Sequence, residues 1–180
     1  MADELLNIVN EQGEVIGEAP RSRIHKEGLL HREINVWFYT PKGEVIFQKR
    51  GPNKDTYPSL LDSAVGGHVD LGESFESAVV RELTEEVGLK VTLGDLYLFK
   101  SYTSNSFDKI TSMRNHAMKK IYLYRYRGDP SGLKVEAGSS GFIWIPVTDL
   151  LSPPYGDDRF IPKMIENAQP LLREILKLTS

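Results

Sequence analysis

Residues 67–89 read GHVDLGESFESAVVRELTEEVGL, and this stretch holds most of the structural information in a chain of 180 residues. From Ser74 to Val87 it contains no glycine or proline, and Gly88 follows, so the pattern predicts a helix that ends at this glycine. At about 100° per residue, one side of the helix is an apolar stripe made of Phe75, Ala78, Val79, Leu83 and Val87. The stripe indicates a helix that packs against the core.

Three carboxylates crowd the same side of this helix. Glu82 and Glu86 fall inside the apolar arc, and Glu85 lies at its edge. Like charges at this spacing cost a helix roughly a few tenths of a kcal/mol, and burying an unpaired carboxylate costs more. A divalent cation removes both penalties, because Mg²⁺ binds carboxylate oxygens and keeps waters for a phosphate. The alternative is a solvated acidic face with Arg81 and Lys90 as partners.

The residues before the helix favour a ligand site. A glycine pair, Gly66-Gly67, lets the backbone approach a ligand and expose a carbonyl group. Glu73 is favoured near the helix start by the helix dipole, or it pairs with Arg81 and fixes the geometry of the loop.

The spacing of these residues resembles the Nudix box, in which glycine, glutamate, Arg-Glu, Glu-Glu and a final glycine stand at fixed intervals. Every fixed position is filled between Gly67 and Leu89, so the chain is identified as a member of the Nudix hydrolase superfamily. Outside the box, the sequence also resembles the branch that includes type 1 isopentenyl-diphosphate isomerases. The resembling segments are the opening hairpin, Leu29–Arg32, Val36-Trp37, Gln48–Pro58 and Phe142–Pro146.

The resemblance implies an α/β (α+β) fold, with a mixed sheet sandwiched between helices. It also implies hydrolysis of a nucleoside diphosphate linked to another moiety, with Mg²⁺ or Mn²⁺ as the cofactor. The metal ligands would be Glu82, Glu85, Glu86 and the carbonyl group of Gly66. The catalytic set would be Glu82, as first choice for the base, together with Glu85 and Arg81.

One departure separates this chain from the isomerases. They have a cysteine just before their Gly-His pair, where this chain has Gly66, and the chain contains no cysteine. Their box is also degraded, whereas this one is intact. Both differences favour a hydrolase, with an isomerase-like enzyme and a non-catalytic Nudix-fold binding protein as alternatives.

Histidines and one glutamate are candidates for additional metal ligands. His25, His31 and His68 fall close to positions where the isomerases bind metal, although each could instead be structural, as we expect for His116. Glu136 is the candidate for the acidic ligand that many Nudix enzymes carry outside the box.

A small basic cluster contains Lys49, Arg50 and Lys54. By resemblance, Arg50 and Lys54 match isomerase residues that contact the diphosphate, and a guanidinium suits phosphate oxygens. The alternative is a solvated strand end. Three aromatic residues either stack on a base or pack in the core, and packing is the commoner role: Trp37, Tyr57 and Phe107.

The rest of the chain reads as strands, turns and a final helix. We expect one domain over residues 1–180, with an N-terminal hairpin over 4–17 and a C-terminal helix over 161–178 that Pro170 kinks or divides. Helical turns are expected over 20–27 and a loop over 51–62. Strands are expected over 34–39, 44–49, 90–102, 119–127 and 142–145.

Composition excludes several classes of site. Without cysteine there are no disulfides, thiolate zinc sites or cysteine nucleophiles. A net charge of −3 and no long basic run argue against a nucleic acid polymer as partner. No signal peptide or membrane span is recognised, so we expect a cytoplasmic protein acting on a small-molecule diphosphate. The exact substrate and the oligomeric state stay open, a homodimer being one option.

Overall fold

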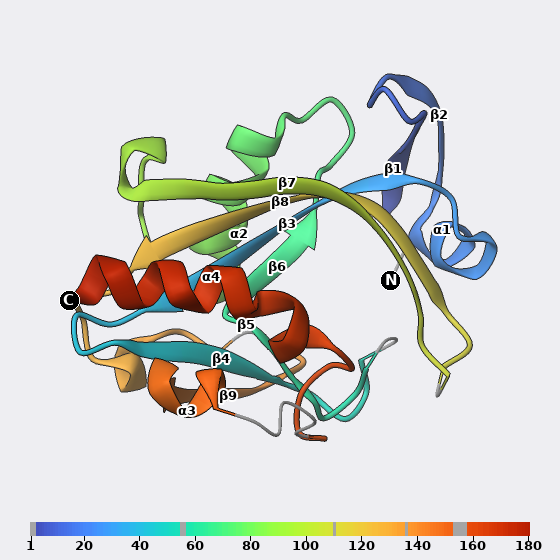
Figure 1. Cartoon of the computed structure of the whole chain (residues 1–180). Helices are drawn as coiled ribbons and strands as arrows, with labels where there is room; N and C mark the ends of the chain where they lie inside the picture. The colour runs from blue at the N-terminus through green and yellow to red at the C-terminus, as the bar shows by residue number, and fades with distance from the viewer. Residues whose placement is uncertain (1–2, 55–56, 110, 136, 153–157) are drawn as a thin grey trace.

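The structure is a computed structural model that describes residues 3–54, 57–109, 111–135, 137–152 and 158–180. Figure 1 shows a long curved sheet with helices on both faces. The elements, in chain order, are β1 (Leu5–Val9), β2 (Val15–Pro20), α1 (Arg21–Glu27), β3 (His31–Tyr39), β4 (Glu44–Arg50), β5 (Leu61–Ser63), β6 (Val65–His68), α2 (Phe75–Val87), η1 (Leu93–Asp95), β7 (Leu96–Phe107), β8 (Arg114–Arg125), η2 (Pro130–Gly132), β9 (Ser139–Pro146), α3 (Val147–Leu151) and α4 (Met164–Thr179).

The main sheet is mixed, and β3 is its central strand. Among the described residues its strand order is β5-β4-β3-β8-β7, with β6 also paired to β3 and β9 to β4. The β3–β8 pair is parallel, whereas β3–β4, β3–β6 and β7–β8 are antiparallel. A separate hairpin is formed by β1 and β2. The expected α/β sandwich is confirmed.

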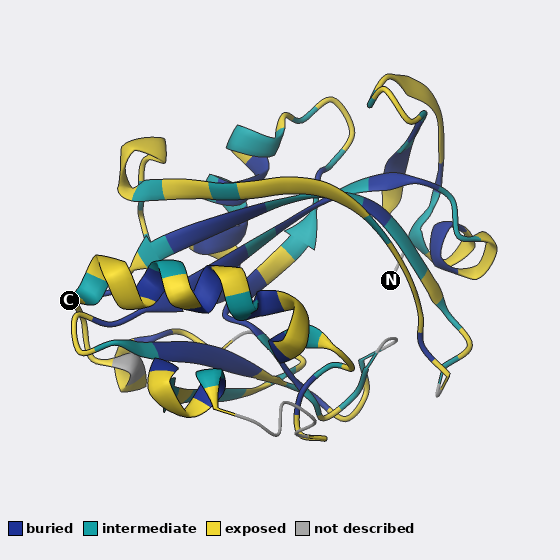
Figure 2. Cartoon of the chain, viewed as in Figure 1, coloured by how far each residue is buried: buried dark blue, intermediate teal, exposed yellow. Residues whose placement is uncertain are grey.

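Strand β3 is buried on both faces, because successive side chains alternate between them. Trp37 and Tyr39 belong to a core that includes α3 and α4. Val36 and Phe38 belong to a second core beneath α2. Figure 2 shows the buried strands running between these two layers. Near the start of β3, the face shared with Trp37 carries polar residues instead: His31, Glu33 and Asn35.

Helix α2 is defined at both ends by local hydrogen bonds. The Ser74 side chain accepts a hydrogen bond from the Ser77 N–H, and the Ser77 hydroxyl accepts one from the Ser74 N–H. Gly88 ends the helix with φ 74°, a left-handed conformation that favours glycine. Leu83 is fully buried against the sheet, which stabilises the fold by roughly 1.5–3 kcal/mol. These bonds and contacts hold the acidic face of α2 in a fixed orientation.

Three expectations about the elements are corrected. The strand expected over 90–102 begins only at Leu96, because the preceding residues form a 3-10 turn in which Asp95 accepts hydrogen bonds from Thr92. Pro170 does not divide α4, which runs from Met164 through it. The loop expected over 51–62 is shorter, because its last two residues belong to β5. No helix in the described ranges is long and apolar enough to cross a membrane.

Candidate active site

The three glutamates of α2 differ in exposure as the helical periodicity predicts. Glu82 and Glu86 are each 9% exposed, whereas the side chain of Glu85 is 61% exposed. Two carboxylates therefore lie inside the protein and the third lies at the rim.

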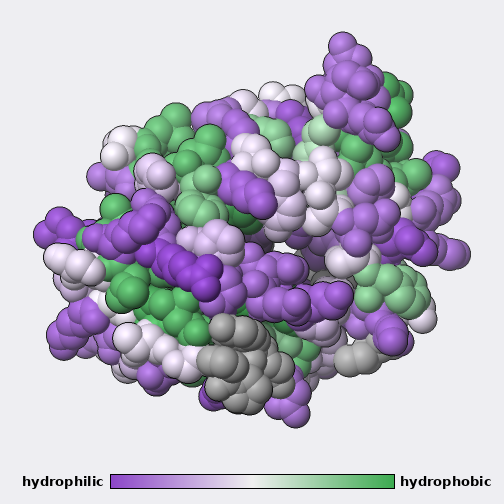
Figure 3. Space-filling model, in the orientation of Figure 1, coloured by the Kyte–Doolittle hydropathy of each residue, from purple (hydrophilic) through white to green (hydrophobic). Residues whose placement is uncertain are grey.

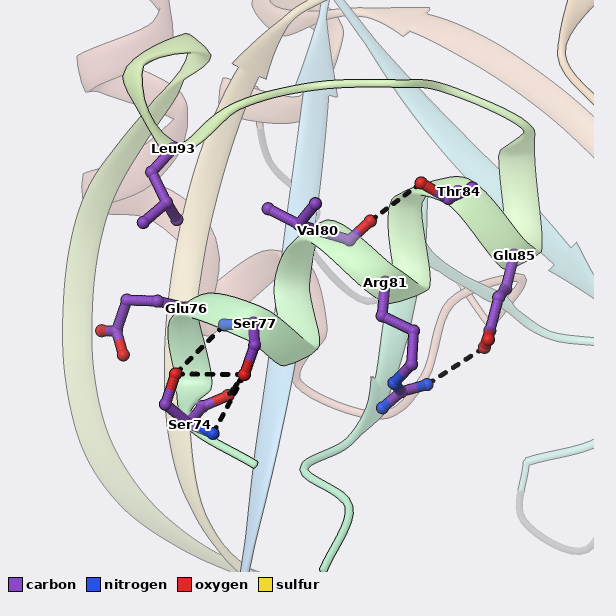
Figure 4. Close-up of a pocket in the computed structure, with 8 residues that line it drawn as sticks. All are labelled: Ser74, Glu76, Ser77, Val80, Arg81, Thr84, Glu85 and Leu93. Carbon is purple, nitrogen blue, oxygen red and sulfur yellow. Dashed lines mark hydrogen bonds and ion pairs between the residues drawn. The ribbon is translucent and has the colours of Figure 1, made fainter. Parts of the chain in front are cut away.

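Arg81 connects the box loop to the helix through one guanidinium. Its Nε and Nη2 donate to the two carboxylate oxygens of Glu73 at 3.1 and 3.0 Å, and Nη2 also donates to the His68 carbonyl at 3.0 Å. Its Nη1 donates to Glu82 at 2.9 Å and to Glu85 at 3.0 Å. Figure 4 shows the contact with Glu85. The expected Glu73–Arg81 pair is confirmed, and it fixes the loop before α2.

Glu82 lies directly against Gly67, the second residue of the glycine pair. A Cβ atom added at Gly67 would collide with the Glu82 carboxylate, so any other residue there would force this carboxylate to move. Burial raises the pKa of Glu82 to about 7, although the charge of Arg81 acts in the opposite direction. A carboxyl group with this pKa exchanges protons near neutral pH.

The donor set around Glu82 suits a hard divalent cation. Glu82 and Glu85 meet the same nitrogen of Arg81, and the backbone of Gly67 lies beside Glu82. Carboxylate and carbonyl oxygens are the ligands that Mg²⁺ prefers. Glu82 and Glu85 thus have the donor type that Mg²⁺ or Mn²⁺ prefers, and Arg81 Nη1 lies between their carboxylates.

A second, more compact group of metal-ligating side chains lies nearby. In the described part of the chain, one ligand atom from each of four residues lies within 4.8 Å of all the others. The His25 and His68 Nε2 atoms are 3.2 Å apart, and His31 Nε2 is 3.2 Å from Glu33 Oε1. We call this group the histidine cluster: His25, His31, Glu33 and His68.

Backbone contacts determine which nitrogens of the cluster carry a proton. The His25 Nδ1 faces the Arg114 carbonyl at 3.3 Å, and the His31 Nδ1 faces the Leu29 carbonyl at 3.0 Å. A carbonyl oxygen can only accept, so Nδ1 of each ring carries a proton and Nε2 is the nitrogen that faces the cluster. Metal-binding histidines are held in this way.

Burial disfavours the charged form of two of the imidazoles. It lowers the pKa of His25, and it lowers the pKa of His68 to about 3. Burial alone would raise the pKa of Glu33, but the Lys119 ammonium and the hydrogen bond with His31 hold it well below its usual range. The cluster thus presents three imidazole groups and one ionised carboxylate.

Asn35 approaches the position where the isomerases have a cysteine. A Cβ atom added at Gly66 would lie 2.6 Å from the Asn35 Nδ2, which donates to the Ser63 Oγ at 3.1 Å. A longer side chain at Gly66 would therefore displace this amide.

The other expected site residues have specific contacts. Arg50 Nη1 donates to Asp62 at 2.9 Å, and Lys54 packs beside Gly138. Trp37 is a core residue, as the commoner role predicted. The Tyr57 N–H donates to the buried Asp108 at 2.8 Å, Phe107 is half-exposed, and Glu136 lies outside the described residues.

An open groove of about 690 Å³ runs along the outer side of α2 (Figure 4). Arg81 and Glu85 of the box line this groove, but the buried Glu82 does not. We therefore do not place the reaction there. On the face shown in Figure 3, a hollow lies between the β7–β8 hairpin and the half that contains α4, and hydrophilic residues surround it.

Sequence reasoning missed Glu33 and Lys119. His31 and Glu33 are two residues apart on one strand, so both face the same side, and that alternation was the available signal.

Comparisons with known proteins agree with this geometry. The NUDIX domain profile matches residues 29–167. An uncharacterized Nudix hydrolase of Streptomyces coelicolor is 40% identical over 99 residues, which are 55% of either chain. An isopentenyl-diphosphate Delta-isomerase of Serratia proteamaculans is 30% identical over 82% of this chain and 79% of its own. The chain thus matches about half the length of the curated hydrolase.

Solved structures share the fold over most of the chain. A crystal structure from Deinococcus radiodurans superimposes with a TM-score of 0.67 at 25% identity, covering 96% of this chain and 99% of that one. The NUDIX domain of Shewanella oneidensis NrtR, crystallised with ADP ribose, has a TM-score of 0.53 at 21% identity over 80% of this chain and 88% of its own.

Proposed function

The chain belongs to the NUDIX domain family, and from this we propose that it is a metal-dependent hydrolase that cleaves a diphosphate linkage in a small molecule. The observation that carries the proposal is the buried Glu82 carboxylate, held between Arg81 and the backbone of Gly67. The same helix keeps Glu85 and Glu86, so no carboxylate of the box is missing.

Each box residue has a proposed role. Glu82 accepts a proton from the attacking water, with Glu85 as the alternative base, because Glu82 is the buried carboxylate that lies against the Gly67 backbone. Arg81 holds both carboxylates in place. The metal ligands are Glu82, Glu85, Glu86 and the Gly66 carbonyl. When bound, Mg²⁺ or Mn²⁺ supplies charge neutralisation on the diphosphate oxygens and lowers the pKa of water.

Arg50 and Lys54 are the proposed contacts to the substrate phosphates. Asp62 orients the Arg50 guanidinium, and a planar guanidinium matches phosphate oxygens. The NrtR structure supports a substrate of the ADP-ribose type, in which a nucleoside diphosphate is linked to another moiety. The histidine cluster is a second proposed metal position, through His31 and His68 with His25.

An isomerase is the second candidate, because the Serratia proteamaculans relative matches most of the chain. The absence of cysteine and the Asn35 amide next to Gly66 argue against it. A binding domain without catalysis is disfavoured because every glutamate of the box is present.

A single incubation separates the first two candidates. The protein is given isopentenyl diphosphate and ADP-ribose in heavy water with Mg²⁺ and Mn²⁺. We expect release of nucleoside monophosphate or phosphate that EDTA abolishes, and no deuterium in dimethylallyl diphosphate. Catalytic deuterium incorporation without hydrolysis would overturn the proposal in favour of an isomerase.

A further inference from the structure

The histidine cluster and the glutamates of α2 are neighbouring but separate groups. They meet at β6, where the His68 ring joins the cluster while the His68 carbonyl accepts from Arg81 and the adjacent Gly67 abuts Glu82. The cluster itself comes from α1, β3 and β6 and includes no residue of α2.

The two carboxylate oxygens of Glu33 have different partners. Oε2 lies 2.7 Å from the Lys119 Nζ. Oε1 lies 3.2 Å from the His31 Nε2 and 3.6 Å from the His68 Nε2. Since Glu33 and Lys119 are paired in the β3–β8 register, the sheet itself holds the ammonium at this position. Glu33 is thereby turned so that a single oxygen faces the imidazoles.

Asn115 adds an independent indication of a ligand. Its Nδ2 donates to Glu33 Oε1 at 2.9 Å. Its Oδ1 is buried and has no hydrogen-bond partner in the described ranges. A buried acceptor without a partner is costly unless something binds it, and this one belongs to a side chain that already bonds the carboxylate of the cluster.

We propose that Glu33 is the fourth ligand of a divalent transition-metal centre formed with His25, His31 and His68, and that Lys119 is its positioning residue. Lys119 holds one carboxylate oxygen so that the other remains directed at the metal. The centre is defined by its donor atoms, so it would exist whether or not the chain hydrolyses a diphosphate.

The donor types select the class of ion. Imidazole nitrogens with one carboxylate suit Zn²⁺, Co²⁺ or Mn²⁺, whereas the all-oxygen donors of α2 suit Mg²⁺. Within the cluster, the charges of Glu33 and Lys119 cancel, and an imidazole that binds a metal does so in its neutral form. A bound divalent ion therefore keeps its full positive charge, which favours an anionic further ligand such as a phosphate.

The test measures metal binding without any substrate. Metal-free protein is titrated with Co²⁺ in excess Mg²⁺, while the visible d–d absorption and the metal content after dialysis are recorded. We expect retention of a single equivalent of Co²⁺ with a nitrogen-ligand spectrum. The His31→Ala variant should lose it, and Glu33→Gln should bind about 10–100-fold more weakly.

Lys119 has a matched control in its neighbour Lys120, which pairs with Glu76 on the opposite face of the sheet. We expect Lys119→Met to weaken Co²⁺ binding and change the spectrum at saturation, Lys119→Arg to restore both, and Lys120→Met to leave both unchanged. Because a single variant leaves one buried charge unpaired, the double variant Glu33→Gln/Lys119→Met serves as the folded comparison. Retention of Co²⁺ with an unchanged spectrum in this double variant would overturn the proposal, as would a wild-type protein that holds no Co²⁺ against Mg²⁺.

Discussion

Arg81 is the residue on which the geometry of the box depends, because one planar guanidinium contacts two side chains of α2, one of the loop and a backbone carbonyl. A lysine has a single ammonium and cannot span these acceptors. We therefore predict that Arg81→Lys lowers kcat/KM on the order of 100-fold, since Glu82 and Glu85 lose their common support.

The control for this prediction is Arg23→Lys, because Arg23 makes an exposed pair with Glu27 on α1. Steady-state kinetics on both variants, with circular dichroism to verify folding, provide the measurement. Full activity in folded Arg81→Lys would show that Arg81 has no part in positioning the carboxylates.

Gly67 gives a second prediction at the residue scale. In Gly67→Ala the new methyl group collides with the Glu82 carboxylate, so Glu82 must move and turnover should fall at least tenfold. Gly132 is the matched control, since a Cβ atom there meets nothing within 4 Å. Equal activity in Gly67→Ala and Gly132→Ala would contradict the close packing of Glu82 on the glycine backbone.

At the scale of elements, an ion pair connects α2 to β8. The Lys120 Nζ lies 2.6 Å from Glu76, and this hydrogen bond lowers the pKa of Glu76 below its usual value of 4.5. A depressed carboxyl pKa contributes stability above the unfolded value, and the contribution is lost as the pH falls through the folded value. Because Glu76 is nearly half exposed, the contribution is below about 1 kcal/mol.

We therefore predict that Glu76→Gln is slightly less stable than the wild type at about pH 7, and that the difference is smaller at about pH 3. Urea unfolding at the two values measures it. A difference that grows as the pH falls would mean that the pair does not stabilise the folded state.

The elements also show which parts of the site could be predicted from the sequence. The position and orientation of α2 follow from local periodicity, so Glu82 and Glu86 were placed inside and Glu85 at the rim. The histidine cluster could not be built from local rules, because His25 and His68 are 43 residues apart and meet only through sheet pairing. Resemblance pointed to the three histidines, while Glu33 and Lys119 depend on the β3–β8 register.

At the scale of the whole molecule, metal binding should stabilise the fold. The histidine cluster joins α1, β3 and β6, so an ion bound only by the folded chain raises its stability by about 2.7 kcal/mol at a hundredfold excess over Kd. We predict that Co²⁺ or Zn²⁺ raises the Tm by roughly 5–10 °C and that Mg²⁺ raises it less.

Differential scanning calorimetry of EDTA-treated protein measures these shifts. His31→Ala should lose the response to Co²⁺ while keeping the response to Mg²⁺. The same shift for both ions in both proteins would show that one site serves them all.

The central claim is that the box hydrolyses a diphosphate with water as the nucleophile. The most direct test is incubation of the protein with Mg²⁺ and a mixture of ADP-ribose and isopentenyl diphosphate in ¹⁸O-labelled water, followed by mass spectrometry of the products. We predict ¹⁸O in a released phosphoryl group, abolished by EDTA and nearly absent in Glu86→Gln. Unlabelled phosphates together with conversion of isopentenyl diphosphate to dimethylallyl diphosphate would contradict the claim.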